Sequence, residues 1–137
     1  MSLSIPATVM NELESVARAA AARAYAPYSK FHVGAAVLGA SGKIYSGCNV
    51  ENASYGLAIC GERNAIFSAV NAGEKSVQAV VIYTPTPVAT APCGACRQVI
   101  REFGPNARVI SVCDGDGRID STLDKLLPES FGPENLK

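Results

Sequence analysis

The order of two kinds of apolar pattern along this chain limits the folds that it can adopt. Three long segments place apolar side chains at helical spacing, over residues 8–25, 60–72 and 93–103. Four shorter apolar runs have the length of strands, over residues 31–38, 44–50, 77–83 and 109–113. A short edge strand near Ile119 and a small helix over residues 122–127 follow. A leading helix followed by this ββαβαβ order predicts an α/β fold with a mixed sheet.

Local signals add detail to this outline. Ser41 and Gly42 offer a turn between the first two strands, which predicts an antiparallel hairpin. In the second long helix we expect Ile66, Phe67 and Val70 to face inward. The run over residues 77–83 is almost entirely apolar, as expected for a strand covered on both faces.

Length and charge limit the function classes. The 137 residues suit one domain, so we expect residues 1–137 to form a single domain. Twelve basic and twelve acidic residues cancel, which argues against a nucleic-acid or membrane-surface partner. The N-terminal residues lack the charged and apolar regions of a secretory signal, and no apolar run has the length of a membrane span. These features predict a cytoplasmic protein with reduced thiols.

Five cysteines, an odd number, cannot all pair in disulfides. Cys93 and Cys96 form a Cys-x-x-Cys pattern at the start of a predicted helix, where the helix dipole stabilises thiolates. Alone, this pattern fits half of a structural zinc site or a redox pair. A redox pair usually follows the first strand of its fold, whereas this one follows the third.

Cys60 begins another predicted helix, two residues before Glu62, so three sulfurs can reach one ion. His32, the only histidine, is read as an ordinary strand residue, and Cys48 and Cys113 as buried apolar filler. Three protein ligands with one open position favour catalytic over structural zinc. Glu62 then becomes the acid/base, although a glutamate in a first helical turn can also simply complement the helix dipole.

The combination of Cys60-x-Glu62 with Pro92-Cys93-x-x-Cys96 resembles the signature of zinc nucleobase deaminases in its three-cysteine form. Further motifs make the chain similar to cytidine deaminases of the small homotetrameric type. The matching stretches are residues 26–31, 33–36, 47–56, 60–63, 92–98, 126–128 and 131–133.

The resemblance implies a three-layer α/β/α sandwich with a five-stranded mixed sheet. It implies one zinc ion per subunit on Cys60, Cys93 and Cys96, with Glu62 moving protons. The implied reaction of pyrimidine salvage is hydrolysis of cytidine and deoxycytidine to uridine and deoxyuridine, with release of ammonia. The implied partner is a small nucleoside, and the implied assembly is a homotetramer with shared active sites.

The resemblance also implies substrate contacts. Asn49 and Glu51 match residues that hold the sugar, and Phe31 matches an aromatic that packs against the nucleoside. Tyr55 and Phe131 match residues contributed across subunit boundaries. Without the resemblance, Asn49 and Glu51 can equally be a polar strand end, and Phe31 and Phe131 core residues.

Three further positions bear on the site. Arg63 matches an arginine that donates to the thiolates and offsets their charge; a solvated helix residue is the alternative. Gly61 stands where the family usually has alanine, a residue whose backbone faces the base, and Ala91 stands where serine is common. Neither change removes a catalytic atom.

Other functions remain open at this stage. Blasticidin-type deaminases also use three cysteines, but the stretch 49–52 fits a nucleoside sugar better. Deoxycytidylate and tRNA-adenosine deaminases typically present His-x-Glu, which is absent here. A zinc-stabilised binding module without catalysis would need a fourth ligand, from His32 or Cys48.

Overall fold

The computed structural model describes residues 4–137. Its helices are α1 (Ala7–Ala21), α2 (Gly61–Asn71), α3 (Gly94–Phe103) and α4 (Leu123–Leu126), with 3-10 turns η1 (Tyr55–Leu57) and η2 (Pro133–Leu136). Its strands are β1 (Gly34–Gly39), β2 (Ile44–Cys48), β3 (Val77–Tyr83), β4 (Arg108–Val112) and β5 (Ile119–Thr122). The predicted order of elements is confirmed, including the short edge strand and the small helix after it.

The five strands form one mixed sheet in the order β2-β1-β3-β4-β5. The β1–β2 hairpin turns at Gly42, whose φ of 92° suits glycine. β1 also pairs antiparallel with β3, β3 pairs parallel with β4, and β5 runs antiparallel to β4. The parallel pair at the centre needs a crossover, which α3 supplies.

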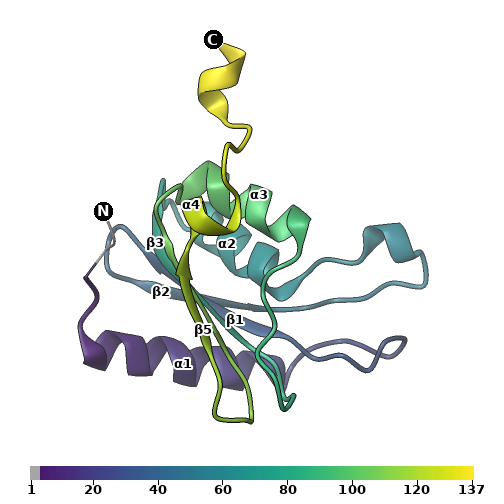
Figure 1. Ribbon diagram of the computed structural model, residues 1–137. Coiled ribbons are helices and arrows are strands. Elements are labelled where there is room, and N and C mark those ends of the chain that lie inside the picture. The colour runs from purple at the N-terminus through teal and green to yellow at the C-terminus, as the bar shows by residue number, and fades with distance from the viewer. Residues whose placement is uncertain (1–3) are drawn as a thin grey trace.

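Helices cover both faces of the sheet, which confirms the predicted three-layer α/β/α sandwich (Figure 1). α1 packs on one face through Leu13 and Ala17, against Ala36 and Val81. The other face is covered by α2 and α3, where Ile66 and Ile100 join a core cluster with alternate residues of β1, β3 and β4. Side chains of a strand point alternately to the two faces of the sheet, so β1 and β3 contribute to both clusters. These central strands are therefore buried on both faces.

The first helix ends four residues earlier than its apolar spacing predicts. After Ala21 the chain leaves the helix, and Tyr25 forms an isolated bridge with Val50. The Tyr25 amide donates to the carbonyl of Asn49 at 3.0 Å, and the Glu51 amide donates to the carbonyl of Tyr25 at 2.9 Å. This long-range pairing overrides the helix propensity of the alanine-rich sequence. It also ends β2 at Cys48, two residues before the predicted end.

The expectation for the α2 side chains is partly wrong. Ile66 is fully buried, but Phe67 is 45% exposed and Val70 is 37% exposed. The side of α2 that packs on the sheet carries Ala65, Ile66 and Ala69 instead. Residues 65, 66 and 69 share one face of the helix, and Phe67 and Val70 lie on the neighbouring side, which is partly exposed.

The sequence predicts neither a secretory signal nor a membrane span. The absence of a signal segment rests partly on residues 1–3, which lie outside the described residues. Within residues 4–137, no helix is both long and apolar enough to cross a membrane.

Candidate active site

Three cysteine sulfurs meet where two helices begin. Cys60 precedes α2 and Cys93 precedes α3 as N-cap residues with extended backbone, and Cys96 lies in the first turn of α3. Pro92 is fully buried directly before Cys93. Because both helix N-termini point at the same place, their unpaired N–H groups and dipoles favour negative charge on the sulfurs.

The spacing of the three sulfurs fits a tetrahedral zinc ion. The Sγ atoms of Cys60 and Cys93 are 3.8 Å apart, and those of Cys93 and Cys96 are 3.5 Å apart. All three lie within 4.8 Å of one another. Tetrahedral zinc with Zn–S bonds of about 2.3 Å places its sulfurs about 3.8 Å apart. The cluster is therefore able to hold zinc with small adjustments only.

The cluster offers three protein ligands and no more. Among the residues that the structure describes, no other His, Cys, Asp or Glu joins a group of metal-ligating spacing. A closed structural site would need a fourth ligand from His32 or Cys48, and neither residue is part of the group. An open fourth position is the arrangement of catalytic zinc sites.

Arg63 adds positive charge beside the sulfurs. Its Nη2 donates to Cys60 Sγ at 3.5 Å. A hydrogen bond from Cys96, and then that from Arg63, lower the pKa of Cys60 to about 5. The pKa of Cys96 rises, because it shares its proton with Cys60 and is buried. These hydrogen bonds therefore favour the thiolate form of Cys60.

Glu62 is buried in the first turn of α2, close to the sulfurs of Cys60 and Cys96. The residue is 5% exposed, and its side chain lines a cavity that opens beside the cluster. Burial, and then the negative charge of Cys60, raise the pKa of its carboxyl. A carboxyl group with a raised pKa in a pocket is suited to accept and return a proton near neutral pH.

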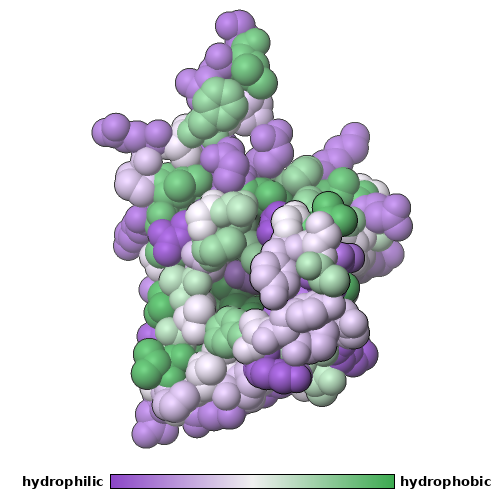
Figure 2. Space-filling view, turned by 90° about the vertical axis from the view of Figure 1, so that its right-hand side faces the viewer, coloured by the Kyte–Doolittle hydropathy of each residue, from purple (hydrophilic) through white to green (hydrophobic). Residues whose placement is uncertain are grey.

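A cavity of about 380 Å³ opens beside the cluster. Cys60, Glu62, Arg63 and Cys93 form one end of it, and Phe31, Asn49 and Glu51 line it as well. The segments that carry these last three project from the sheet at the right of Figure 1, and the space-filling view of that side has a hollow between its side chains (Figure 2). The volume suits a small molecule.

Asn49 is buried in the wall of the cavity and already bridges two backbone groups. Its Oδ1 accepts from the Val33 amide at 2.8 Å, and its Nδ2 donates to the Phe31 carbonyl at 2.7 Å. Each end of the amide retains capacity for one further hydrogen bond. Asn49 thus fixes the segment that carries Phe31 and still offers polar atoms to a ligand.

Glu51 is held in place by the loop before β1. Its carboxylate accepts from the amides of Tyr28 and Ser29, at 3.0 and 3.1 Å, and from the Ser29 hydroxyl. The hydroxyl is the largest cause that holds the pKa of Glu51 below its ordinary value. Glu51 therefore presents a charged, oriented carboxylate to the cavity.

The remaining predicted substrate residues do not line this cavity. Gly61 is buried in the first turn of α2. Tyr55 is 76% exposed and borders an adjoining hollow, where its ring meets that of Tyr28 edge-on at 5.8 Å. Phe131 is 58% exposed and lies near α3, where its carbonyl accepts from the Gln98 side chain.

Sequence reasoning missed part of the wall. The missed lining residues are Ser29, Val33, Ala58, Ile59, Ile82, Thr84 and Thr90. Most are small or apolar and carry no chemical signal by themselves. Ala58, Ile59 and Thr90 precede a cysteine helix, Ile82 and Thr84 lie at the end of β3, and Ser29 and Val33 lie before β1. The carboxyl end of a strand such as β3 is where ligands gather in α/β sheets.

Comparisons with known proteins agree with this geometry. The family profile "Cytidine and deoxycytidylate deaminase zinc-binding region" matches residues 8–113. A cytidine deaminase of Sporosarcina psychrophila is 43% identical over 128 residues, which cover 93% of this chain and 94% of that protein.

Two solved structures share the fold closely. The cytidine deaminase of Burkholderia pseudomallei is 45% identical with a TM-score of 0.84, covering 88% of this chain and 98% of that one. The cytidine deaminase of Mycobacterium tuberculosis is 40% identical with a TM-score of 0.78, covering 90% and 97%. With its three-cysteine cluster and this extent of similarity, the chain belongs to the cytidine and deoxycytidylate deaminase family.

Proposed function

We propose that this protein hydrolyses cytidine and deoxycytidine to uridine and deoxyuridine, releasing ammonia. The observation that carries the proposal is the placement of buried Glu62 beside three converging thiols, at one end of a cavity with polar groups along its wall. The whole chain, residues 1–137, would act as one catalytic domain, with one zinc ion on Cys60, Cys93 and Cys96. Close relatives that bear the name cytidine deaminase support the assignment.

In this mechanism Glu62 is the proton carrier. When bound, zinc supplies a Lewis acid that makes water acidic near neutral pH. Glu62 accepts a proton from the attacking water and delivers it to N3 of the base as the oxygen bonds to C4. A second proton passes from the new C4 hydroxyl through Glu62 to the amino group; the C4–N bond breaks to release ammonia and the C4 carbonyl of uridine forms. The raised pKa of Glu62 suits both transfers.

Arg63 has a supporting role. Three thiolates around Zn²⁺ would leave a net negative charge, which would make the bound metal a weaker Lewis acid. The Arg63 guanidinium donates to Cys60 Sγ at 3.5 Å and draws charge away from the sulfur. Arg63 therefore keeps the open position electrophilic.

The charges around the cavity favour a nucleoside over a nucleotide. Within residues 4–137, the acidic and basic residues that line it are Glu51, Glu62 and Arg63, and Arg63 is engaged with Cys60. A 5′-phosphate would meet no free cation here and would be repelled by Glu51. Asn49 and Glu51 instead offer acceptors and a donor to sugar hydroxyls, Phe31 offers its ring to the nucleoside, and the backbone of Gly61 would face the base.

We further propose that the protein works in the cytoplasm, in pyrimidine salvage, as a homotetramer with shared sites. Five free thiols suit a reducing compartment. Large apolar side chains remain exposed, among them Val50, Leu57 and Phe67, and neighbouring subunits would cover them. Tyr55 and Phe131 do not line the cavity of their own chain, so they would complete that of a neighbour.

A substrate panel tests the proposal. Zinc-loaded protein is offered cytidine, deoxycytidine, deoxycytidylate, cytosine and blasticidin S, with absorbance and ammonia as readouts. We expect turnover of the two nucleosides and little of the nucleotide. Preference for blasticidin S or deoxycytidylate would refute the nucleoside assignment, and sedimentation of a fully active monomer would refute the shared site.

A further inference from the structure

The loop over residues 84–92 forms one wall of the candidate active site. Thr84, Thr90 and Ala91 line the cavity, and the loop leads directly into Cys93. We propose that Cys113, outside the metal cluster, is a positioning residue that holds this loop in its substrate-binding shape. The inference rests on the proposed function, since the cavity in question is the nucleoside pocket.

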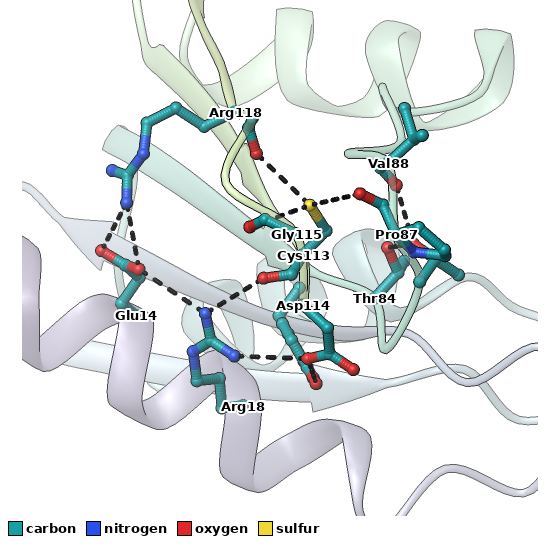
Figure 3. A network of polar contacts seen from close by, with 12 residues as sticks. Glu14, Arg18, Thr84, Pro87, Val88, Cys113, Asp114, Gly115 and Arg118 are labelled. Atoms are coloured by element: carbon teal, nitrogen blue, oxygen red, sulfur yellow. Dashed lines mark hydrogen bonds and ion pairs between the residues drawn. The ribbon is translucent and has the colours of Figure 1, made fainter.

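The thiol of Cys113 lies in a cradle of backbone oxygens. Cys113 is 3% exposed, directly after β4. Its Sγ is 3.6 Å from the carbonyl oxygen of Pro87, 3.6 Å from that of Gly115 and 3.3 Å from that of Gly117 (Figure 3). The single S–H proton can be donated to any of the three, and the sulfur fills the space between the loop and the turn. Cys113 is buried as expected, but it is not merely apolar filler.

The loop and the turn after β4 also touch backbone to backbone. The Asp114 amide donates to the Thr86 carbonyl at 2.9 Å. A Cβ atom at Gly115 would lie 2.1 Å from the Pro87 carbonyl oxygen, so only glycine allows this approach. The middle of the loop is therefore docked on the segment that Cys113 begins.

The opposite side of Cys113 is fixed by α1. Arg18 donates to the Cys113 carbonyl at 3.3 Å, and its guanidinium lies 3.7 Å from the Asp114 carboxylate (Figure 3). The same guanidinium is 4.4 Å from the centre of the Tyr83 ring, whose hydroxyl donates to Asp114. These contacts make the segment at Cys113 a firm base for the loop.

Hydrogen bonds within the loop connect its anchored middle to the part that lines the pocket. Thr84 and Thr86 share a hydrogen bond between their hydroxyls at 2.7 Å, and the Thr86 hydroxyl lies 2.7 Å from the Val88 carbonyl. Only a few residues separate this braced part from Thr90 and Ala91. A displacement of the middle of this loop would therefore move the pocket wall at Thr90 and Ala91. Small misplacements of binding groups weaken substrate binding strongly.

The test compares Cys113→Ala with Cys113→Ser, with Cys48→Ala as a control for the loss of a thiol in β2, at the far edge of the sheet. Cys48 is half-buried, so the expectation that it is buried filler is wrong. Losing one neutral hydrogen bond and its packing should raise the KM for deoxycytidine about threefold to tenfold in Cys113→Ala, with kcat and zinc content near wild type. Cys113→Ser should recover most of the KM, because its hydroxyl can donate to the same carbonyls. Cys48→Ala should keep the wild-type KM.

A purely structural role of Cys113 would lower the unfolding temperature and leave the KM unchanged, and that result overturns the proposal. An equally raised KM in the serine variant overturns it too. Amide hydrogen exchange of residues 84–92 gives an answer that does not depend on activity: exchange should be faster in Cys113→Ala and restored in Cys113→Ser. If wild-type protein turns over no nucleoside, the proposed function fails, while the exchange data still decide the role of Cys113.

Discussion

Replacing Gly47 in β2 by alanine should disturb the metal cluster by pushing α2 away from the strand. A Cβ atom at this position in β2 would lie 2.3 Å from the Ala65 nitrogen, 2.8 Å from the Asn64 carbonyl carbon and 2.8 Å from the Gly61 oxygen. All three are backbone atoms of the helix, so no side-chain rotation can relieve the clash. The helix itself has to move away from the strand.

The size of that movement follows from ordinary contact distances. A Cβ atom rarely approaches other atoms closer than 3.4 Å, so α2 must shift away from β2 by about 1 Å. Metal sites tolerate changes of only about 0.2 Å in the distance between metal and ligand, so this shift is large enough to disturb zinc binding. Cys60 and Glu62 lie at the end of the helix that moves, whereas Cys93 and Cys96 belong to α3. Overpacking of this kind typically costs about 1–3 kcal/mol of unfolding free energy.

The assay measures zinc per chain after dialysis against a chelator, together with the unfolding temperature. Gly47→Ala should retain less zinc than wild type and unfold at a lower temperature. The control is Gly94→Ala, directly after a cluster cysteine but with open space around its Cβ position, which should retain wild-type zinc. Wild-type zinc and unfolding temperature in Gly47→Ala would refute the argument that this close approach sets the position of Cys60.

Three further predictions concern carboxylates. Glu62→Gln should keep its zinc but lose turnover by at least about a hundredfold, because the amide cannot carry protons; substantial activity would contradict its role. Ser29→Ala should raise the pKa of Glu51 and move the acid limb of kcat/KM to higher pH, since the Ser29 hydroxyl is the largest cause of the lowered pKa; an unmoved limb would count against sugar binding by Glu51. Ser41→Ala should destabilise the protein at neutral pH, because Ser41 is the largest cause that lowers the pKa of Glu74. A lowered pKa of Glu74 stabilises the fold at pH values above the ordinary pKa of 4.5, and this contribution is lost as pH falls through the lowered pKa. The difference in unfolding free energy between Ser41→Ala and wild type, measured by urea unfolding, should therefore become smaller in acid. A difference that does not change with pH would exclude the charge effect.

Much of the metal cluster could be predicted because its geometry is local. Cys93 and Cys96 are three residues apart on one helix, and Cys60 begins the helix before the intervening strand, so the topology brings them together. The core strand over residues 77–83 was equally clear, because a continuous apolar run of that length fits a strand buried on both faces.

Features set by contacts between distant segments were not predictable. The pairing of Tyr25 with Val50 ends α1 early, and nothing in the alanine-rich sequence indicates it. Phe67 carries an apolar side chain at helical spacing and yet is 45% exposed, because it lies beside the face of α2 that packs on the sheet and not on it. The hold of Ser29 on Glu51 joins residues 22 positions apart through a loop. Sequence periodicity reports on burial within one element and not on which loops meet.

We propose that nucleoside deamination by this protein depends on a zinc ion held by the three-cysteine cluster. The most direct measurement follows the loss of cytidine absorbance with protein as purified, after removal of zinc by a chelator, and after zinc is added back. We expect the rate to fall in proportion to the zinc removed and to recover on its return, with one zinc per chain at full activity. Unchanged deamination by the zinc-free protein, or none by the fully loaded protein, would contradict the account.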